Sequence, residues 1–232
     1  MKKKILAISL IVIIGVLGVL TPFVIKSIKN KNSNTFNEYQ LKKLDVFKEE
    51  NNSIIECDVV FVGDSLTDGY PISEFYSELK AYNRGIGGDR TKDVLNRMEI
   101  SIYNAKPKVV VILIGGNDVL AGKSESYIIK NYKEILNGIK NNLPNTEIII
   151  QSNYPLANDY ASKNKTMLSL NTKLKDIASK NGLTYVDLYT PLLDKTTNEL
   201  ILNYTPDSVH LNVDGYKVVT SVLKPIILEK LK

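Results

Sequence analysis

Short apolar runs rich in β-branched residues alternate along this chain with longer amphipathic segments, and this alternation is the feature that most limits its fold. The runs are too short for core helices and lack the polar alternation of half-buried strands. Such runs are typical of strands that are buried on both faces of a parallel sheet. They lie at residues 59–62, 109–114, 147–150 and 183–186, and a further strand is expected around 81–86.

Between these runs, apolar residues recur at the spacing of one helix face. The sequence therefore predicts an α/β fold with a doubly wound sheet. It shows no internal repeat and no second boundary within the globular part. The expected helices cover residues 38–50, 91–103, 126–140, 165–180 and 213–231, the last of them interrupted at Pro225.

The N-terminus carries an uncharged apolar run from Ile5 to Ile25, preceded by three lysines. As a helix, these 21 residues would span about 31 Å, close to the thickness of the hydrocarbon core of a bilayer. A cleaved signal peptide usually has a shorter apolar region that ends at a small-residue cleavage site, and no such site precedes Lys26. We expect a membrane anchor at 1–25, a polar tether at 26–37 and a globular domain at 38–232.

The orientation of this expected anchor rests on a small difference in charge. Three lysines lie on each side of the apolar run, and the positive charge of the free amino terminus favours an N-terminus on the cytoplasmic side. The sequence thus predicts a single-pass protein of the cell membrane with its domain outside the cell. Secretion after cleavage of a signal peptide is the alternative.

The net charge of +5 belongs to the N-terminus. Residues 1–32 hold six lysines and no acid, which leaves 24 basic against 25 acidic side chains in the rest of the chain. A nucleic-acid binder needs its basic surface on the folded domain, so we do not expect nucleic acid as a partner. With one cysteine and one histidine, neither an internal disulfide nor a Cys- or His-built metal site is possible.

Four short motifs follow expected strands or lie in a late loop, where open α/β sheets bind ligands. They are Gly63-Asp64-Ser65-Leu66, Gly87-Gly88-Asp89, Gly115-Gly116-Asn117-Asp118 and Asp207-Ser208-Val209-His210. Together, in this order, they resemble the four blocks of the SGNH hydrolases, also called GDSL esterases and lipases. The run from Asn83 to Asp89 is similar to the second block of the bacterial and platelet-activating-factor-acetylhydrolase-like esterases, although Arg90 replaces the small polar residue usual there.

The resemblance implies a three-layer α/β/α sandwich with a flavodoxin-like parallel sheet, and a serine esterase that needs no metal and no cofactor. It assigns Ser65, His210 and Asp207 to a catalytic triad, and the backbone N–H of Ser65, the N–H of Gly88 and the side chain of Asn117 to the oxyanion hole. The residue chemistry agrees, because His210 is the one ordinary base available at neutral pH and Asp207 precedes it at a spacing that can orient it. Asp64 and Asp118 are expected to hydrogen-bond within their own loops.

Each motif also has a simpler interpretation. Ser65 could be a helix N-cap, the Gly87-Gly88 pair could be a tight turn, and Asn117 could cap the following helix. The string from Val62 to Asp68 also resembles a late motif of haloacid-dehalogenase phosphatases, but the earlier D-x-D motif that those enzymes need is absent. A non-catalytic surface protein on the same fold is a further alternative.

The sequence limits the leaving group of the ester less than it limits the type of reaction. The family takes acetylated carbohydrates, lysophospholipids, short acyl esters and thioesters. The expected anchor favours an acylated glycan or lipid at the cell surface, and the short segment from Val119 to Glu125 offers no long apolar lid. We therefore expect a short-chain acyl or acetyl esterase, with a lysophospholipase or thioesterase as the alternative.

Overall fold

The structure is a computed structural model, which describes residues 36–232. The chain separates into a first unit that ends at residue 41 and a compact second unit, residues 42–232. The predicted anchor at Ile5–Ile25 lies outside the described residues and stays a prediction. Among residues 36–232, no helix combines the length and the apolar character that crossing a bilayer requires.

A five-stranded parallel sheet lies at the centre of the second unit, which confirms the predicted α/β class. The strand order is β2-β1-β3-β4-β5, the order of flavodoxin-like folds. Because β1 and β3 are central and parallel, their carboxyl ends meet at one edge of the sheet. The strands are β1 (Val59–Gly63), β2 (Ala81–Gly85), β3 (Val109–Leu113), β4 (Glu147–Gln151) and β5 (Thr184–Val186).

Side chains of β1 alternate between two hydrophobic cores. Val60 and Val62 contribute to one core, whereas Val59 and Phe61 contribute to the other. All five residues of this strand are buried, since helices cover both faces of the sheet. This double burial explains why the sequence of β1 is a continuous apolar run rather than an alternating one.

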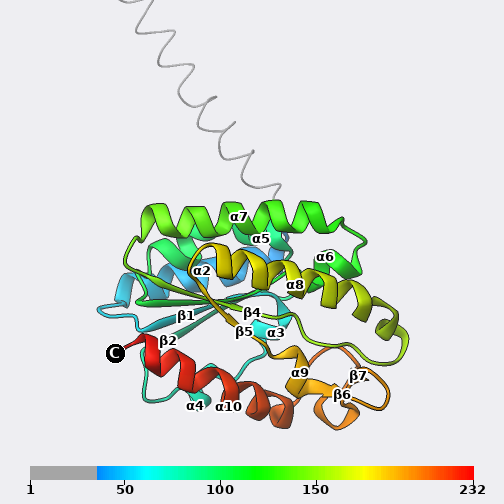
Figure 1. Cartoon of the computed structure of the whole chain (residues 1–232). Helices are drawn as coiled ribbons and strands as arrows, with labels where there is room; N and C mark the ends of the chain where they lie inside the picture. The colour runs from blue at the N-terminus through cyan, green and yellow to red at the C-terminus, as the bar shows by residue number, and fades with distance from the viewer. Residues whose placement is uncertain (1–35) are drawn as a thin grey trace, which may run out of the picture. The chain divides into compact units, whose positions relative to one another are not determined.

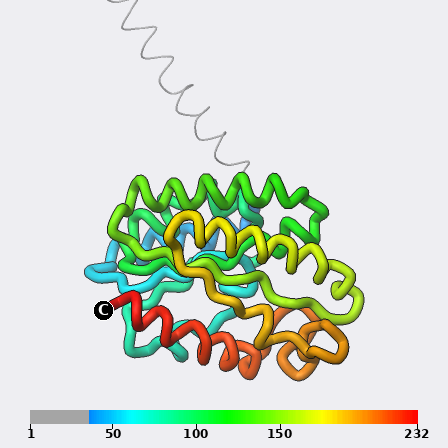
Figure 2. Tube along the Cα trace, in the orientation of Figure 1, coloured from blue at the N-terminus to red at the C-terminus, as the bar shows by residue number. Residues whose placement is uncertain are grey.

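Helices flank the sheet on both sides, as Figure 1 shows, with α5, α7 and α8 on one side and α4 and α10 on the other. In Figure 2 the green helix α7 and the red helix α10 run on opposite sides of the sheet. The longer helices are α2 (Glu38–Ser53), α5 (Thr91–Asn96), α7 (Glu125–Asn142), α8 (Asn164–Lys180) and α10 (Val213–Lys230). Four single-turn helices are α3 (Ser65–Asp68), α4 (Ile72–Phe75), α6 (Gly116–Leu120) and α9 (Tyr189–Leu192).

Two expected helices differ from the prediction. The segment 91–103 is not one helix: α5 ends at Asn96 and a π-helical turn, η1, covers Glu99–Tyr103. The break coincides with Arg97, whose side chain turns into the interior.

Conversely, α10 is not interrupted at Pro225 but continues through it. Leu223 and Ile227, one turn apart on either side of Pro225, are both fully buried, and their packing offsets the hydrogen bond that proline cannot donate.

Smaller elements complete the chain, and their sequences carry too few residues for a periodic signal. A two-stranded antiparallel hairpin pairs β6 (Leu193–Asp194) with β7 (Glu199–Leu200). Two 3₁₀ turns are η2 (Asn158–Lys163), between β4 and α8, and η3 (Leu202–Tyr204), between β7 and α10.

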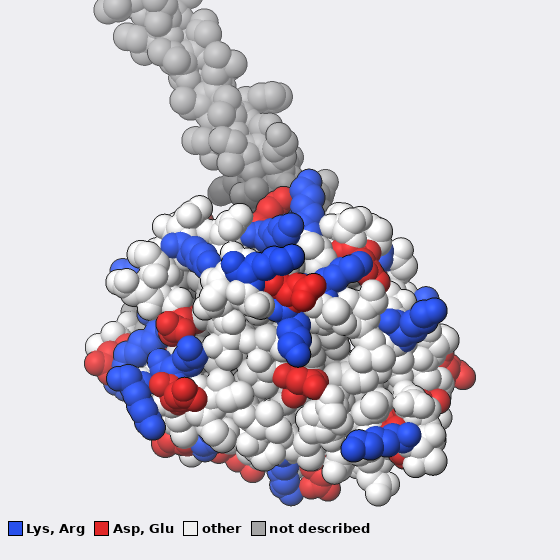
Figure 3. All heavy atoms as spheres, viewed as in Figure 1, with Lys and Arg blue, Asp and Glu red and all other residues white. Residues whose placement is uncertain are grey.

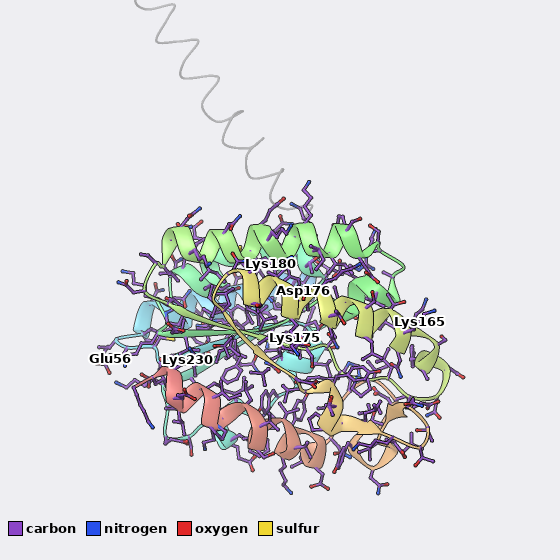
Figure 4. All side chains as sticks on the ribbon, viewed as in Figure 1. Glu56, Lys165, Lys175, Asp176, Lys180 and Lys230 are labelled. Atoms are coloured by element: carbon purple, nitrogen blue, oxygen red, sulfur yellow. The ribbon has the colours of Figure 1, made fainter. Side chains whose placement is uncertain are left out.

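Charged side chains of both signs are interspersed on the face shown in Figure 3, which fits the near-neutral balance of the globular part. Figure 4 labels Lys165, Lys175, Asp176 and Lys180 along α8. It also labels Glu56 and Lys230 at the end of the sheet where the strands begin. At that end Lys230 forms an ion pair with the first residue of β4, Glu147, at 3.3 Å.

Candidate active site

Ser65 is the first residue of α3, directly after the tight turn that joins β1 to this helix. The Asp64 side chain caps α3, because its Oδ1 accepts a hydrogen bond from the Leu66 N–H at 3.0 Å. Gly63 is required by close packing, since a Cβ at this position would lie 2.2 Å from the Leu113 carbonyl oxygen and 2.2 Å from the Thr67 hydroxyl. The turn therefore presents the Ser65 hydroxyl at the carboxyl edge of the sheet.

His210 lies beside Ser65, although 145 positions separate them in the sequence. Its Nε2 is 2.9 Å from the Ser65 Oγ, and its Nδ1 is 2.6 Å from the Asp207 Oδ2. The other oxygen of Asp207 accepts the backbone N–H of His210 at 2.7 Å and that of Val209 at 3.1 Å. A hydrogen on Nδ1 would thus be held by Asp207, which leaves Nε2 as the acceptor for the Ser65 hydroxyl.

The loop that carries Asp207 and His210 is held in place by hydrogen bonds from the segment after β4. Ser208 adopts a left-handed conformation with φ of 75°, which is strained for a residue with a side chain. Its carbonyl oxygen accepts the Ala157 N–H at 3.0 Å, and its hydroxyl accepts the Asn158 side chain at 2.7 Å. These two bonds stabilise the tight turn that brings Asp207 back onto the imidazole ring.

Gly88 and Asn117 lie at the same edge of the sheet, Gly88 in the loop after β2 and Asn117 in α6, which follows β3. Gly88 has a φ of 80°, is exposed, and has no heavy atom within 4 Å of the position a Cβ would take. Asn117 is the second residue of α6, and its Nδ2 donates to the Asp89 carbonyl oxygen at 3.0 Å. The residue that caps α6 is Gly115, with a φ of 112°, so Asn117 does not act as the cap.

A small pocket opens beside Ser65. Its volume is about 20 Å³, slightly more than the roughly 10–15 Å³ that one water molecule needs in the same terms. Apolar side chains form much of its wall, and Gly116 and Asn117 contribute the side next to α6. The apolar members are Leu66, Leu120, Leu156, Met167 and Val209, with Asn153 and Tyr154 from the segment after β4.

Two aspartates beneath the site are buried. Asp64 binds its own loop, as the sequence predicts, whereas Asp118 does not: its carboxyl binds Thr91 at the start of α5. Burial raises the pKa of Asp64 to about 7, although the hydrogen bond from Leu66 acts in the opposite direction. Burial also raises the pKa of Asp118, whose two oxygens accept the N–H and the hydroxyl of Thr91. These carboxyls therefore hold the loops that surround Ser65 and are not displayed to solvent.

Asp207 behaves differently because half of its side chain is exposed. Its slight burial acts to raise the pKa, but the hydrogen bonds from the His210 ring and from two backbone N–H groups outweigh that effect. The pKa of Asp207 is consequently lowered, and the carboxylate is charged at neutral pH. A negative charge next to Nδ1 stabilises a protonated imidazole.

The structure thus brings all five predicted site residues to one edge of the sheet, and places Ser65, His210 and Asp207 in direct contact. The sequence analysis did not identify the pocket residues Asn153, Leu156 and Met167. Their segments show an ordinary strand end and an ordinary helix face, so they offer no local signal. Within residues 36–232, no group of three or more His, Cys, Asp or Glu side chains is arranged to hold a metal ion.

Comparison with known proteins gives a consistent picture. The sequence model of the GDSL-like lipase/acylhydrolase family matches residues 61–218. The platelet-activating factor acetylhydrolase IB subunit alpha2 of Homo sapiens is 42% identical over 80 residues, which cover 30% of this chain. The match spans only 35% of the length of that subunit. The same subunit from Gallus gallus is 29% identical over 184 residues, which cover 76% of this chain and 79% of the relative.

Solved structures with the same fold include a GDSL-like lipase from Bacteroides thetaiotaomicron. It has a TM-score of 0.73 and 25% identity, covering 80% of this chain and 97% of its own. A catalytic mutant of an acetylxylan esterase from Geobacillus stearothermophilus has a TM-score of 0.63 and 21% identity. That match covers 75% of this chain and 96% of the esterase, and at this identity it speaks to the fold alone.

Proposed function

This chain belongs to the GDSL-like lipase/acylhydrolase family, and from that premise we propose that it is a serine esterase whose nucleophile is Ser65. The observation that carries the proposal is the continuous line of contacts from Asp207 through His210 to the Ser65 hydroxyl, at 2.6 and 2.9 Å. This is the order of groups that lets a weak hydroxyl nucleophile lose its proton as it attacks.

In the proposed reaction, Ser65 Oγ attacks the ester carbonyl carbon while His210 Nε2 takes the hydroxyl proton. The tetrahedral intermediate collapses, His210 gives that proton to the departing alcohol, and an acyl-enzyme remains. Water then attacks the acyl carbon, with His210 again as the base, and Ser65 is restored as the acid leaves. The Asp207 carboxylate holds the ring and stabilises its cationic form in both halves.

The negative charge on the carbonyl oxygen needs donors that are already in place. We assign this role to the backbone N–H groups of Ser65 and Gly88 and to the amide of Asn117. Gly88 supports the assignment because its backbone is exposed and left-handed, and because the space where a Cβ would lie is empty. Asn117 supports it because its Nδ2 carries a second hydrogen beyond the one bonded to Asp89.

For the substrate, we propose a short acyl ester, with acetyl as the first candidate. The pocket beside Ser65 has room for little more than one small group, which favours a methyl over a long chain. The name of one relative points the same way, because it is a subunit of a platelet-activating factor acetylhydrolase. An acetylated carbohydrate or lipid is therefore the proposed substrate class, with a lysophospholipase or thioesterase activity as the alternative.

The cellular place of the reaction is also a proposal. If the apolar run Ile5–Ile25 anchors the chain in the cell membrane with the domain outside, the substrate would be a surface glycan or a lipid of that membrane. A cleaved signal peptide would release the same domain instead. Mass determination of the mature N-terminus in a membrane fraction separates these two outcomes.

The direct test is hydrolysis of p-nitrophenyl esters of increasing acyl length by the full chain, with Ser65→Ala as the control. We expect activity that depends on Ser65, is highest with acetate and falls sharply by hexanoate. Activity that rises with chain length would support the lipid alternative. Full activity in Ser65→Ala would exclude the mechanism, and a folded wild-type protein inactive on all of these and on acetylated glycans and thioesters would favour a non-catalytic role.

A further inference from the structure

Arg97 is a fully buried arginine that the proposed mechanism does not use. Its guanidinium donates four hydrogen bonds. Nε donates to Asp89 Oδ2 at 2.7 Å, and Nη2 donates to the Gly63 carbonyl at 2.9 Å. Nη1 donates to the Arg84 carbonyl and to the Ser101 hydroxyl, both at 2.8 Å. Both Arg97 and Asp89 have side chains that are 0% exposed. One side chain therefore ties the carboxyl ends of β1 and β2 to the loop that follows β2.

The loop that Arg97 holds governs two of the three proposed oxyanion donors. Gly88, which offers its N–H, directly precedes Asp89 in the chain. Asn117, which offers its side chain, donates one Nδ2 hydrogen to the Asp89 carbonyl oxygen. That bond sets the direction of the second Nδ2 hydrogen, because the amide group is planar. The positions of both donors thus depend on where Asp89 is held.

We propose that the buried Arg97–Asp89 ion pair positions the oxyanion hole by fixing Gly88 and Asn117 relative to Ser65. This inference rests on the proposed esterase function. Oxyanion donors are effective because they need no reorientation during the reaction, and a displacement of about 1 Å can cost about a hundredfold in rate. A planar guanidinium bound along all its edges has little freedom to move. Arg97 is a positioning residue, since it acts through Asp89.

Arg84 offers a matched control. It is also 0% exposed and forms an ion pair with Glu50 and a hydrogen bond to Asn51 at 3.0 Å. Its guanidinium carbon lies 4.7 Å from the centre of the Phe47 ring. None of these side-chain partners belongs to the proposed oxyanion hole, and the Arg84 carbonyl that binds Arg97 is a backbone group, which the substitution keeps. Arg84→Met therefore measures what the loss of a buried arginine costs by itself.

The test compares full-length variants on p-nitrophenyl acetate, each assayed well below its own melting temperature. The double variant Arg97→Met/Asp89→Leu removes both charges, so that neither is left buried without its partner. We expect its kcat to fall about 10- to 100-fold with KM changed less than about twofold, because the donors act on the transition state. Arg97→Lys keeps the charge and should lie in between, whereas Arg84→Met should keep kcat within about twofold.

A second comparison uses Asn117→Ala as the background. If Arg97 acts through Asn117, the further loss caused by Arg97→Met/Asp89→Leu should shrink to less than half on a logarithmic scale. A loss that is fully multiplicative would overturn the proposal that Arg97 positions both donors, because Asn117 would then have no part in its effect. So would a double variant with a lower melting temperature and an unchanged kcat, or an Arg84→Met variant that loses as much kcat. If the double variant does not fold, Arg97→Lys carries the same comparisons.

The Ser65→Ala variant tests the proposed esterase function, and the Arg97 variants test the positioning role. Activity that survives Ser65→Ala would overturn the esterase mechanism, and this inference with it. Activity that requires Ser65 but does not respond to the Arg97 variants would overturn only the positioning role.

Discussion

The two ends of the central sheet use charge in opposite ways. At the end where the strands begin, Lys108 pairs with Asp58 at 2.8 Å and Lys230 pairs with Glu147 at 3.3 Å, with most of these side chains in contact with solvent. At the end where the strands finish, Asp64 is buried to 3% exposure, and the Arg97–Asp89 pair is completely enclosed. Both ends carry ionisable groups, but Asp64 and the Arg97–Asp89 pair are buried only at the end where the strands finish.

The difference shows where this fold places polar groups that are costly to bury. Exposed ion pairs contribute about 0–1 kcal/mol each, because water screens them and long side chains lose freedom when they pair. Buried charges lose their hydration and persist only with well-placed partners. Their positions are therefore well defined, which suits the edge where the proposed donors must be in place before the reaction.

The pKa values follow the same division. At the beginning of the strands, the hydrogen bond from Lys108 lowers the pKa of Asp58. At their ends, burial raises the pKa of Asp64 to about 7. Asp58 is therefore held charged, whereas Asp64 still binds a proton in about half of the molecules at pH 7. Substitutions at the two ends should thus have different consequences.

The largest effect should come from Asp207→Asn at the carboxyl edge. An asparagine can still accept the backbone N–H groups of Val209 and His210, but it cannot stabilise a cationic imidazole. We expect kcat on p-nitrophenyl acetate to fall about 10³- to 10⁴-fold, with a nearly unchanged melting temperature because the side chain is half exposed. A variant that keeps a tenth of the activity would contradict the role assigned to Asp207.

Asn117→Ala should have the next largest effect. Removing one oxyanion donor is expected to lower kcat about 10²- to 10³-fold, since the donor bonds most strongly to the transition state. Steady-state kinetics separate this from a binding defect. A change confined to KM would argue that Asn117 contacts the substrate only in its ground state.

Asp64→Asn tests the buried aspartate through stability. The carboxyl of the unfolded chain ionises near pH 4, whereas in the folded protein its pKa is about 7. Between these values the folded protein keeps a proton that the unfolded chain has released, so Asp64 makes the free energy of unfolding fall as pH rises.

Asparagine removes this titration and keeps the acceptor for the Leu66 N–H. We expect the decrease in unfolding free energy between pH 5 and pH 8 to become smaller by about 2–3 kcal/mol in the variant. Denaturant unfolding at the two pH values measures it. The same pH dependence in both proteins would show that Asp64 is ionised in the folded state.

Lys108→Ala, at the opposite end of the sheet, should have the smallest effect. We expect it to lower the free energy of unfolding by less than about 1 kcal/mol, with less effect at high salt, and to leave kcat unchanged. A loss of activity here would break the comparison, because it would mean that the two ends of the sheet are coupled.

Much of this architecture was predictable from local sequence. The apolar runs at 59–62 and 109–114 predicted strands that are buried on both faces, because double burial demands apolar residues at every position. Motifs directly after those strands could be placed at a common edge, since parallel strands end on the same side. The predicted break of α10 at Pro225 was wrong because buried contacts on both sides of the proline maintain the helix.

Other features had no local signal. Met167 occupies an ordinary apolar position on α8, and only the packing of α8 against α6 makes it a wall of the pocket. In the sequence, Arg97 occupies a polar position of an amphipathic segment, yet its side chain is among the largest that are fully buried in the described residues. In each case the role depends on which distant backbone groups lie nearby, and a sequence window does not contain them.

The sequence alone determined the class of fold, the order of its strands along the chain and the residue types available for acyl transfer, because hydrophobic periodicity and a single histidine are local properties. The tertiary structure decided that His210 reaches Ser65 across 145 positions, that Asp64 is buried deeply enough to hold a proton, and that Arg97 binds two strand ends at once. Hydrogen-bond geometry and desolvation depend on distances between segments that only the folded chain brings together.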